Sequence, residues 1–429
     1  MKYNNDNTNE NLKQLTPETL IVGIDIAKIT HVARAVDYRG IELDKEIAFN
    51  SNIKGFRLLI AWIHELQLKH KKTEVIVGME PTGPYGHTLA HFLDSGNIRT
   101  VLVFGKNVKS LRELDDNTPS KNDRKDALTI ARLIKDGRFR KLRKFDEPIM
   151  ALKEAMMHNR QLTSDLTRVK CRIDNWICQY FPEFSIVFKD WEKKTAFSTL
   201  SNFPMPAEIN KLTSKQIVTV WRKDGVIKGV GLKKAIELKR YAMVTTGLSS
   251  ASEFAGNHIR NMIDQYNLLC EQQDELWMAI DALLKDIPLY NTVIQIPHIS
   301  KKAVCGIVAE LGDVSDFSHP KQLVRLSGLS LAECTSGKKR GLITITKRGR
   351  PHLRHWLYIA VLNIIKDKEP TFWSLHQYYT KREKNPLKPM QSIIALCCKL
   401  LRVIFGMATK GCAYDPTLIT AGIPSLKAA

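Results

Sequence analysis

The sequence predicts an α/β domain near the N-terminus, two long helices that flank an insertion, and a mainly helical C-terminal domain. Between residues 20 and 136, short apolar or β-branched runs alternate with stretches of helical apolar spacing, which is typical of a mixed sheet with flanking helices. The predicted strands occupy residues 20–26, 31–36, 46–50, 74–79 and 100–104. The predicted helices occupy residues 54–69, about 87–93, and the stretch that begins at Asp123.

Two longer stretches, residues 152–180 and 259–287, carry apolar residues at alternating steps of three and four. Each has one polar residue within its apolar series, Asn159 in the first and Gln273 in the second, and such a residue can set the register of a coiled coil. We expect an antiparallel coiled-coil arm or a dimerisation element, with an insertion at about residues 182–256. Two ordinary amphipathic core helices explain the same spacing, and both interpretations remain open at this stage.

The composition favours a nucleic-acid partner. The chain has 429 residues, with 65 Lys and Arg against 44 Asp and Glu, so its formal net charge is +21. Such an excess favours either nucleic acid or an anionic membrane surface. The most apolar late stretch, residues 392–408, is interrupted by Lys399 and Arg402, which indicates a buried helix. Eight Cys without a CxxC pattern predict reduced thiols, so we expect a cytoplasmic protein.

These patterns divide the chain into five expected segments. The first eleven residues include five Asn and no apolar run, which is typical of a disordered tail. The expected segments are a tail at 1–18, an α/β domain at 19–145, a coiled-coil arm at 146–288, a C-terminal domain at 289–415 and a second tail at 416–429.

Four acidic residues of the N-terminal domain form a candidate metal site. Asp25 lies within an apolar run, where a carboxylate is costly to bury unless it is paired or binds a metal. Glu80 ends another predicted strand, and Asp123 and Asp126 share a helix face at i and i+3. Such carboxylates can hold two Mg²⁺ ions for phosphoryl transfer. Taken singly, each acid is better explained by a turn, surface or helix-terminal position, and only the set favours a metal site.

A basic loop in the C-terminal domain is a candidate phosphate-binding element. Seven Lys and Arg and no acid lie between Ser336 and Arg354, and glycines flank the cluster. We expect these residues to contact nucleic acid: Lys338, Lys339, Arg340, Lys347, Arg348, Arg350 and Arg354. A solvated basic face accounts for the charge equally well. Ser336 has no base beside it in sequence, so the residues alone favour a turn position for it.

Two further segments suggest hairpins between helices. Residues 296–300 (Ile-Pro-His-Ile-Ser) resemble half of a helix-hairpin-helix, an element that binds a duplex through its backbone amides. Residues 229–234 (Gly-Val-Gly-Leu-Lys-Lys) allow a phosphate-contacting hairpin, although a plain turn is the simpler interpretation.

Several motifs together resemble the insertion-sequence 110 family. These proteins are recombinases with an N-terminal RuvC-like DEDD domain of the RNase H type and a C-terminal transposase domain that carries a serine. The resemblance covers nearly the whole chain after the tail. Its most specific motifs are residues 23–28 (Gly-Ile-Asp-Ile-Ala-Lys), 80–83 (Glu-Pro-Thr-Gly), 121–127 (Lys-Asn-Asp-Arg-Lys-Asp-Ala), 327–329 (Ser-Gly-Leu), 336–337 (Ser-Gly) and 347–349 (Lys-Arg-Gly).

The resemblance implies a function and a set of site residues. Asp25, Glu80, Asp123 and Asp126 match the family's metal-binding tetrad, which uses Mg²⁺, and Ser336 matches its serine nucleophile. The implied reaction is strand exchange between donor and target DNA through a 5′-phosphoserine link. The resemblance also implies that the two sites come from different subunits of a dimer or of a tetramer on DNA. A structured non-coding "bridge" RNA would pair with both DNAs and choose the sequence.

Two other functions fit the same residues. A structure-selective nuclease of RuvC type would use the same acids with water as the nucleophile. A non-enzymatic nucleic-acid-binding protein would need only the basic residues, although the apolar setting of Asp25 speaks against it.

Overall fold

The computed structural model describes residues 6–80, 83, 85–115, 123–143, 145–226, 231–250, 252–332, 335–336, 339–341 and 343–420. The chain divides into two compact units, Met1–Lys144 and Phe145–Ala429. Each unit has its own hydrophobic core, and each is described by itself.

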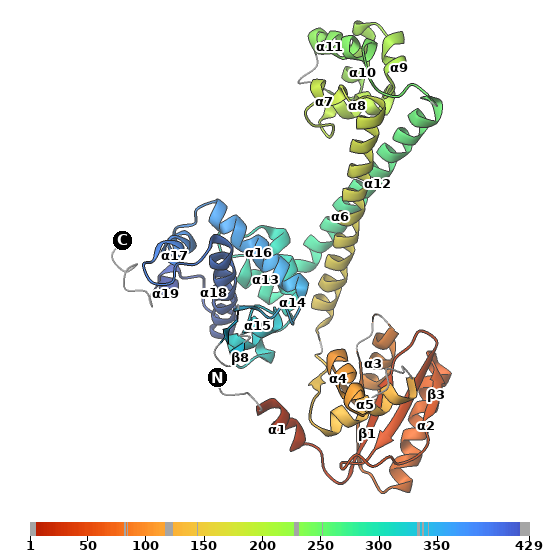
Figure 1. The fold of residues 1–429 in the computed structure, drawn as a ribbon, viewed down its shortest axis with the longest axis vertical. Helices are drawn as coiled ribbons and strands as arrows, with labels where there is room; N and C mark the ends of the chain where they lie inside the picture. Colours follow the sequence, from red (N-terminus) through yellow and green to blue (C-terminus); the bar gives the residue numbers. More distant parts are fainter. Residues whose placement is uncertain are drawn as a thin grey trace. The chain divides into compact units, whose positions relative to one another are not determined.

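The N-terminal unit is built on a six-stranded mixed sheet in the order β3-β2-β1-β4-β5-β6 (Figure 1). β1 runs antiparallel to β2 and parallel to β4, which is itself parallel to β5. The strands are β1 (Thr19–Asp25), β2 (Thr30–Val36), β3 (Ile47–Asn50), β4 (Glu74–Met79), β5 (Arg99–Leu102) and β6 (Arg140–Lys141). The mixed sheet that the sequence predicted is therefore confirmed.

Helices cover both faces of this sheet. α2 (Ile53–Lys69) and α3 (Tyr85–Ser95) share one core with Val22, Ile24 and Met79 of the central strands. α4 (Gly105–Asp115) and α5 (Asp123–Lys135) share the other core with Ile21 and Ile76. This division follows from the strand period of two, which sends neighbouring residues to opposite faces.

The start of the chain departs from the prediction of a disordered tail. Residues Asp6–Leu12 form helix α1. The Asn11 side chain donates hydrogen bonds to the carbonyl oxygens of Gly137 (2.9 Å) and Phe139 (3.0 Å), which ties α1 to the end of the unit. The Asn-rich composition did not reveal this, because the partners lie more than a hundred residues away.

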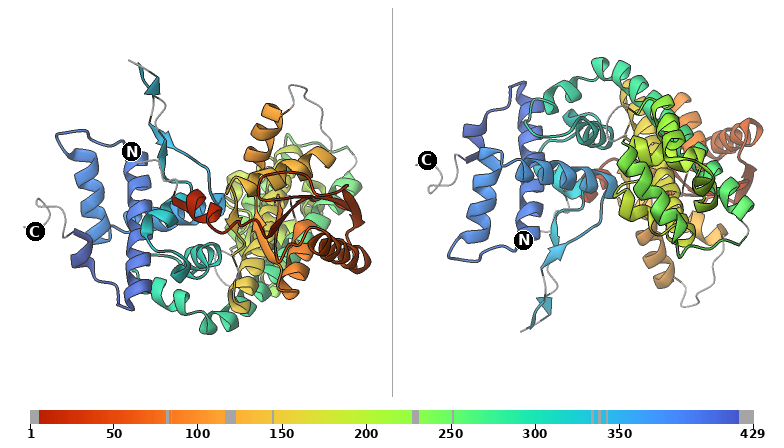
Figure 2. Two further views of the ribbon diagram at one scale, coloured as in Figure 1. Left: turned by 90° about the horizontal axis from the view of Figure 1, so that it is seen from below. Right: turned by 90° about the horizontal axis from the view of Figure 1, so that it is seen from above.

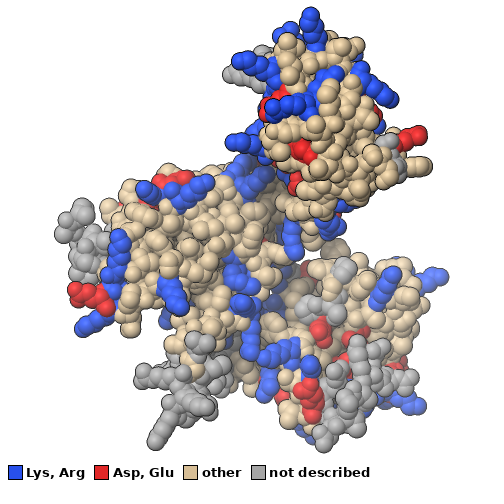
Figure 3. Space-filling model, turned by 45° about the horizontal axis from the view of Figure 1, so that its top comes forward, with Lys and Arg blue, Asp and Glu red and all other residues tan. Residues whose placement is uncertain are grey.

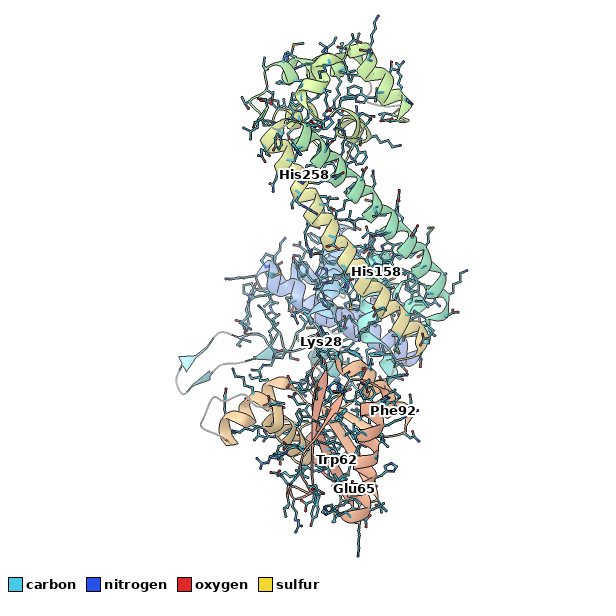
Figure 4. The ribbon with its side chains drawn as sticks, turned by 90° about the vertical axis from the view of Figure 1, so that its right-hand side faces the viewer. Lys28, Trp62, Glu65, Phe92, His158 and His258 are labelled. Atoms are coloured by element: carbon cyan, nitrogen blue, oxygen red, sulfur yellow. The ribbon has the colours of Figure 1, made fainter. Side chains whose placement is uncertain are left out.

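Two long helices form the arm of the second unit. α6 (Glu147–Tyr180) and α12 (Ser252–Leu283) lie side by side, with His158 on the first and His258 on the second (Figure 4). Their cross-contacts run in opposite chain directions: the Trp176 indole bonds to the carbonyl of Ala255, and the Arg172 side chain bonds to Gln265. Further along, Asn159 meets Gln273. The two helices are therefore antiparallel.

The polar residues of the two heptad series meet each other inside the arm. Asn159 is 4% exposed, and its Oδ1 accepts hydrogen bonds from Gln273 Nε2 (3.3 Å) and from the Trp277 indole (3.1 Å). The Gln273 amide also donates to the Thr163 hydroxyl (3.1 Å). A shift of register would separate these groups and leave Asn159 buried without partners, so the pair fixes the alignment.

The insertion folds as a small helical lobe at the end of the arm (Figure 1). Its fully buried Trp221, Phe181 and Phe184 share one core with the adjoining parts of α6 and α12. Its helices are α7 (Phe184–Val187), α8 (Lys194–Asn202), α9 (Pro206–Lys211), α10 (Ser214–Lys223) and α11 (Leu232–Met243). The suggested hairpin at 229–234 lies partly outside the described residues; within them, Gly231 stands at the N-cap of α11.

The C-terminal domain is mainly helical, as predicted. The chain continues through the short helix η1 (Leu284–Asp286) into a core formed by α13 (Pro288–Val293), α14 (Lys301–Leu311), η2 (Val314–Asp316), α15 (Pro320–Leu326), α16 (Pro351–Lys366), α17 (Pro370–Lys381) and α18 (Pro389–Lys410). α18 is long and apolar enough to cross a membrane by length and composition. Leu396, Leu400 and Ile404 of α18 are fully buried in the common core, so α18 is a core helix.

The remaining strands and the end of the chain complete this unit. β7 (Leu331–Ala332) pairs with β10 (Thr344–Ile345), and β8 (Thr335–Ser336) pairs with β9 (Lys339–Arg340), both antiparallel. These strands project away from the helices (Figure 2). Residues Pro416–Thr420 form α19, in which Ile419 is 3% exposed within the core, so part of the expected second tail is ordered by apolar packing.

Candidate functional site

Asp25 and Glu80 lie next to each other at one edge of the sheet. β1 and β4 are parallel neighbours, and Ile24 pairs with Met79, one residue before each acid. Parallel strands present their carboxyl ends at the same edge, where neighbouring strands are about 4.8 Å apart. The two acids therefore stand side by side where both strands end. Lys28, which follows β1, marks this edge in Figure 4.

Strand periodicity also decides which face the two acids share. A Cβ on Gly23 would lie 2.3 Å from the carbonyl oxygen of Ala127, and one on Gly78 would lie 2.3 Å from the Ile134 side chain. Both glycines therefore face α5. Asp25 and Glu80 follow these glycines by two residues, so they belong to the same face as α5.

The Glu80 carboxylate occupies space that a glycine leaves open. A Cβ on Gly105, the first residue of α4, would lie 2.1 Å from Glu80 Oε1. The carboxylate therefore lies against the N-terminus of α4, where the helix dipole and the free N–H groups favour a negative charge. The sequence reasoning missed Gly105, because nothing in the pattern connects it to an acid 25 residues earlier.

The third described acid comes from α5. Asp126 is 7% exposed and directly precedes Ala127, the residue whose carbonyl lies against Gly23. This close approach brings the start of α5 to the strand end that carries Asp25. Asp123 begins the same helix one turn earlier, but its side chain lies outside the described part of the structure. Among the described side chains, no group of three or more His, Cys, Asp or Glu is placed to hold a metal ion.

A buried histidine supports the loop that follows Asp25. His31 on β2 is fully buried, and its Nδ1 accepts a hydrogen bond from the backbone N–H of Ala27 (3.2 Å). Its ring lies against Phe49 and Phe56, and this burial lowers the pKa of His31. The ring therefore stays neutral, which leaves Nδ1 free to accept the bond. The sequence reasoning did not identify His31.

Ser336 lies on a small hairpin of the second unit. It ends β8, and in the register of the hairpin it pairs with Lys339 of β9. The side chains of Ser336, Lys339 and Arg340, and the whole of Lys338, lie outside the described part of the structure. The nearby Ser327 is fully buried and donates its hydroxyl to the carbonyl of Val324 (2.8 Å), so it is inaccessible to a substrate.

The described basic residues of this region divide into two pairs. Lys347 and Arg348 are exposed. Arg350 Nη1 bonds to the carbonyl of Glu310 and lies 3.6 Å from the Glu310 carboxylate, while Arg354 Nη1 donates to the carbonyl of Ser327 (2.8 Å). Arg350 and Arg354 thus hold the base of the loop in place, a role that charge alone did not distinguish from binding.

The segment at 296–300 connects two helices, as its resemblance to a hairpin suggested. His298 has φ +61°, the left-handed region that favours glycine, at the position where a hairpin usually has glycine. Its Nδ1 lies 3.2 Å from the Asp367 carboxylate, and the Ser300 hydroxyl accepts from the N–H of Ala303 (3.4 Å) at the start of α14. The connection therefore keeps a hairpin form without glycine.

A mixed sheet of this order, with acids at the carboxyl edge and on a helix packed across it, is consistent with the RuvC-like DEDD class of domains. The comparison with protein families agrees: a DEDD transposase model of the IS110 family matches residues 22–182, and the model of the transposase IS116/IS110/IS902 family matches residues 290–377. The chain belongs to the IS110 family of transposases. No curated protein matches it at a significant level.

Proposed function

We propose that this transposase is an RNA-guided DNA recombinase that cuts and rejoins DNA through Ser336 and a Mg²⁺-dependent site at Asp25, Glu80, Asp123 and Asp126. The family implies DNA strand cleavage and transfer. The observation that supports the finer proposal is that Asp25 and Glu80 stand at the ends of two neighbouring parallel strands, on the sheet face that α5 covers. α5 begins at Asp123 and carries Asp126.

The residues at this edge suit a divalent metal. Glu80 and Asp25 supply carboxylate oxygens, the ligands that Mg²⁺ prefers, and the space beside Gly105 lets Glu80 reach the sheet edge. Asp126 and Asp123 would complete the set from α5. Bound Mg²⁺ would supply positive charge to the phosphate oxygens during cleavage.

Ser336 would act as the nucleophile. Its hydroxyl would release its proton to water while the oxygen attacks a DNA phosphorus. The bond from that phosphorus to the 3′ oxygen would break, the 3′ oxygen would take up a proton from water and leave as a 3′-hydroxyl, and the phosphate would stay on Ser336 as a 5′-phosphoserine link. The exposed Lys347 and Arg348 at the foot of the hairpin would hold the negative phosphate, while Arg350 and Arg354 fix that foot to α14 and α15.

Sequence choice would come from a structured non-coding RNA that pairs with donor and target DNA. Such a division of labour suits a chain with formal net charge +21, since a basic protein can hold backbones while base pairing reads sequence. We further propose that the acids and Ser336 act on one DNA from different subunits. The acids and Ser336 belong to different compact units of the chain, Met1–Lys144 and Phe145–Ala429, which suits such an exchange.

A set of acid variants tests the metal site. Asp25→Asn and Glu80→Gln should each abolish recombination of labelled donor and target DNA, measured with guide RNA and Mg²⁺, while the thermal midpoint stays near that of the wild type. Glu74→Gln is the matched control, because Glu74 lies at the opposite end of β4. Retained recombination in both acid variants would overturn the proposed metal site.

A further inference from the structure

The lobe at the end of the arm is a part of the molecule to which neither family comparison extends. The two family models match residues 22–182 and 290–377, so residues 183–289 lie between them. The lobe, residues 183–250, packs on the end of the arm and shares one buried core with residues 162–177 of α6 and 255–269 of α12. The family matches therefore assign no role to the surface of the lobe.

The lobe is basic. It contains twelve Lys and Arg and six Asp and Glu. Several of its acids are engaged in local contacts: Glu183 accepts from Thr245 and Thr246, Asp224 accepts from Ser198 and Asn202, and Glu208 pairs with Arg260. Only the Glu208 contact pairs the acid with a cation, and Asp224 is exposed next to Lys223. The lobe therefore keeps the positive charge that its composition indicates.

Some of the cations have structural roles. Lys234 Nζ lies 4.9 Å from the centre of the Phe188 ring, and Lys239 Nζ bonds to the carbonyl of Leu212. These two lysines hold α11 against the neighbouring segments, so their charges are engaged within the lobe.

Other cations form an exposed row on α10. Lys215, Arg222 and Lys223 are exposed, and Thr219 lies among them at the i+4 position. Ile217 and Trp221 are fully buried on the opposite side of this helix. α11 packs against α10 and adds the exposed Lys233 and Arg240. Within the described residues, these five cations form no ion pair. Figure 3 shows Lys and Arg side chains over the outer surface of the lobe.

The arm places this row well away from Ser336. Met156 lies in the core of the C-terminal domain, and the helix continues from there to Tyr180 at the lobe, a length of about 36 Å at 1.5 Å per residue. Duplex DNA rises about 3.4 Å per base pair, so this distance corresponds to about ten base pairs.

We propose that the α10 row, Lys215, Arg222 and Lys223, binds the phosphate backbone of duplex DNA that extends beyond the cut site. The proposal rests on the proposed function only in taking DNA as the substrate. Cations without acidic partners, on a helix face without exposed apolar residues, suit contact with phosphates and not with an apolar protein surface. The partner of this row is DNA, because DNA is the nucleic acid that the family implies.

The test compares the affinities of two triple variants for a labelled random-sequence duplex of about 40 base pairs, measured by fluorescence anisotropy in full-length protein across a salt series. Lys215→Gln/Arg222→Gln/Lys223→Gln should weaken binding at least about tenfold and reduce the slope of log K against log salt by about three. The control, Lys54→Gln/Arg57→Gln/Lys71→Gln, removes the same charge from exposed positions at and after α2 and should keep the wild-type slope.

A second measurement keeps the proposal testable if the triple variant fails to fold. A photo-crosslinking amino acid at Thr219 should attach to the DNA duplex, and the same group at the exposed Leu58 of α2 should not. Wild-type affinity and slope in the folded triple variant, or attachment to a competing RNA duplex instead of DNA, would overturn the proposal. Neither readout requires cleavage, so failure of the serine mechanism would leave these results interpretable.

Discussion

Single glycines create the space in which the acidic site is built. Gly23 lets the backbone of α5 lie directly on β1, Gly78 receives Ile134, and Gly105 makes room for the Glu80 carboxylate. Each contact lies within 2.3 Å of the position that a Cβ would take. The positions of the acids therefore depend on the lack of a side chain at these three glycines as well as on the acids themselves.

The contact at Gly105 leads to a prediction about activity. Gly105→Ala places a methyl group 2.1 Å from Glu80 Oε1, so the carboxylate must turn away from the sheet edge. Strand cleavage should fall at least about tenfold, because misplacing a catalytic group by an ångström can cost that much or more, while the thermal midpoint should barely change. Gly96→Ala, where the nearest atom is 3.5 Å away, is the control. Full cleavage by the Gly105→Ala protein would contradict this reading.

The contact at Gly23 leads to a prediction about stability. Gly23→Ala would drive a methyl group into the carbonyl oxygen of Ala127 and the nitrogen of Ala131, which are backbone atoms that cannot turn away. We expect the free energy of unfolding to fall by about 3 kcal/mol, as for severe overpacking. Gly406→Ala in α18 meets nothing within 4 Å and should instead stabilise by about 0.5–1 kcal/mol. Denaturant titration of both proteins measures the difference.

At the scale of elements, the arm owes its alignment to a polar contact inside an apolar seam. Asn159→Ala would leave the Trp277 indole N–H without its acceptor and the Gln273 amide with only the Thr163 hydroxyl. The arm should lose about 1–3 kcal/mol of stability, the cost of an unsatisfied buried donor. Gln161→Ala, an exposed position on the same helix, should change it by less than about 0.5 kcal/mol. Hydrogen exchange of α6 amides would report the loss, and equal exchange in the two variants would refute it.

The basic loop separates into elements with different roles. Arg350→Ala removes the bond to the Glu310 carbonyl and leaves the carboxylate, whose side chain is 16% exposed, without this ion pair. It should therefore lower the thermal midpoint. Lys347→Ala/Arg348→Ala removes two exposed charges and should weaken DNA binding while leaving the midpoint unchanged. Thermal melting together with DNA titration distinguishes the two effects. An unchanged midpoint in Arg350→Ala, or a lowered midpoint with unchanged DNA binding in Lys347→Ala/Arg348→Ala, would contradict these roles.

The sequence predicted elements best where the signal is periodic. Spacing between residues close in sequence was enough to predict the strands of the sheet and the heptads of the arm. The same spacing marked Asn159 and Gln273 as the polar positions of those heptads. It failed where order depends on distant partners, as for α1, which is held through Asn11 by Gly137 and Phe139. The same limit applies to the site: Asp25 and Glu80 were visible as acids at strand ends, whereas Gly105 and His31 gain their roles only through tertiary contacts.

At the scale of the whole molecule, one buried and two partly buried histidines make stability depend on pH. Burial lowers the pKa of His31, His352 and His376 below the ordinary value of 6.5. Below pH 6.5 the unfolded chain therefore binds more protons than the folded one, so stability is fully present above about pH 6.5 and is lost as the pH falls further. Denaturant titrations should show this decline, and His31→Gln should make it shallower. An unchanged slope in that variant would show that His31 does not contribute.

The central claim is that Ser336 carries the DNA during recombination. The most direct test is to incubate the protein with guide RNA, Mg²⁺ and end-labelled DNA, stop the reaction under denaturing conditions, and map the labelled peptide by mass spectrometry. We predict a covalent adduct at Ser336 that disappears in Ser336→Ala and persists in Ser330→Ala. Recombination without any adduct, or an adduct that survives Ser336→Ala, would contradict the account and favour water or another residue as the nucleophile.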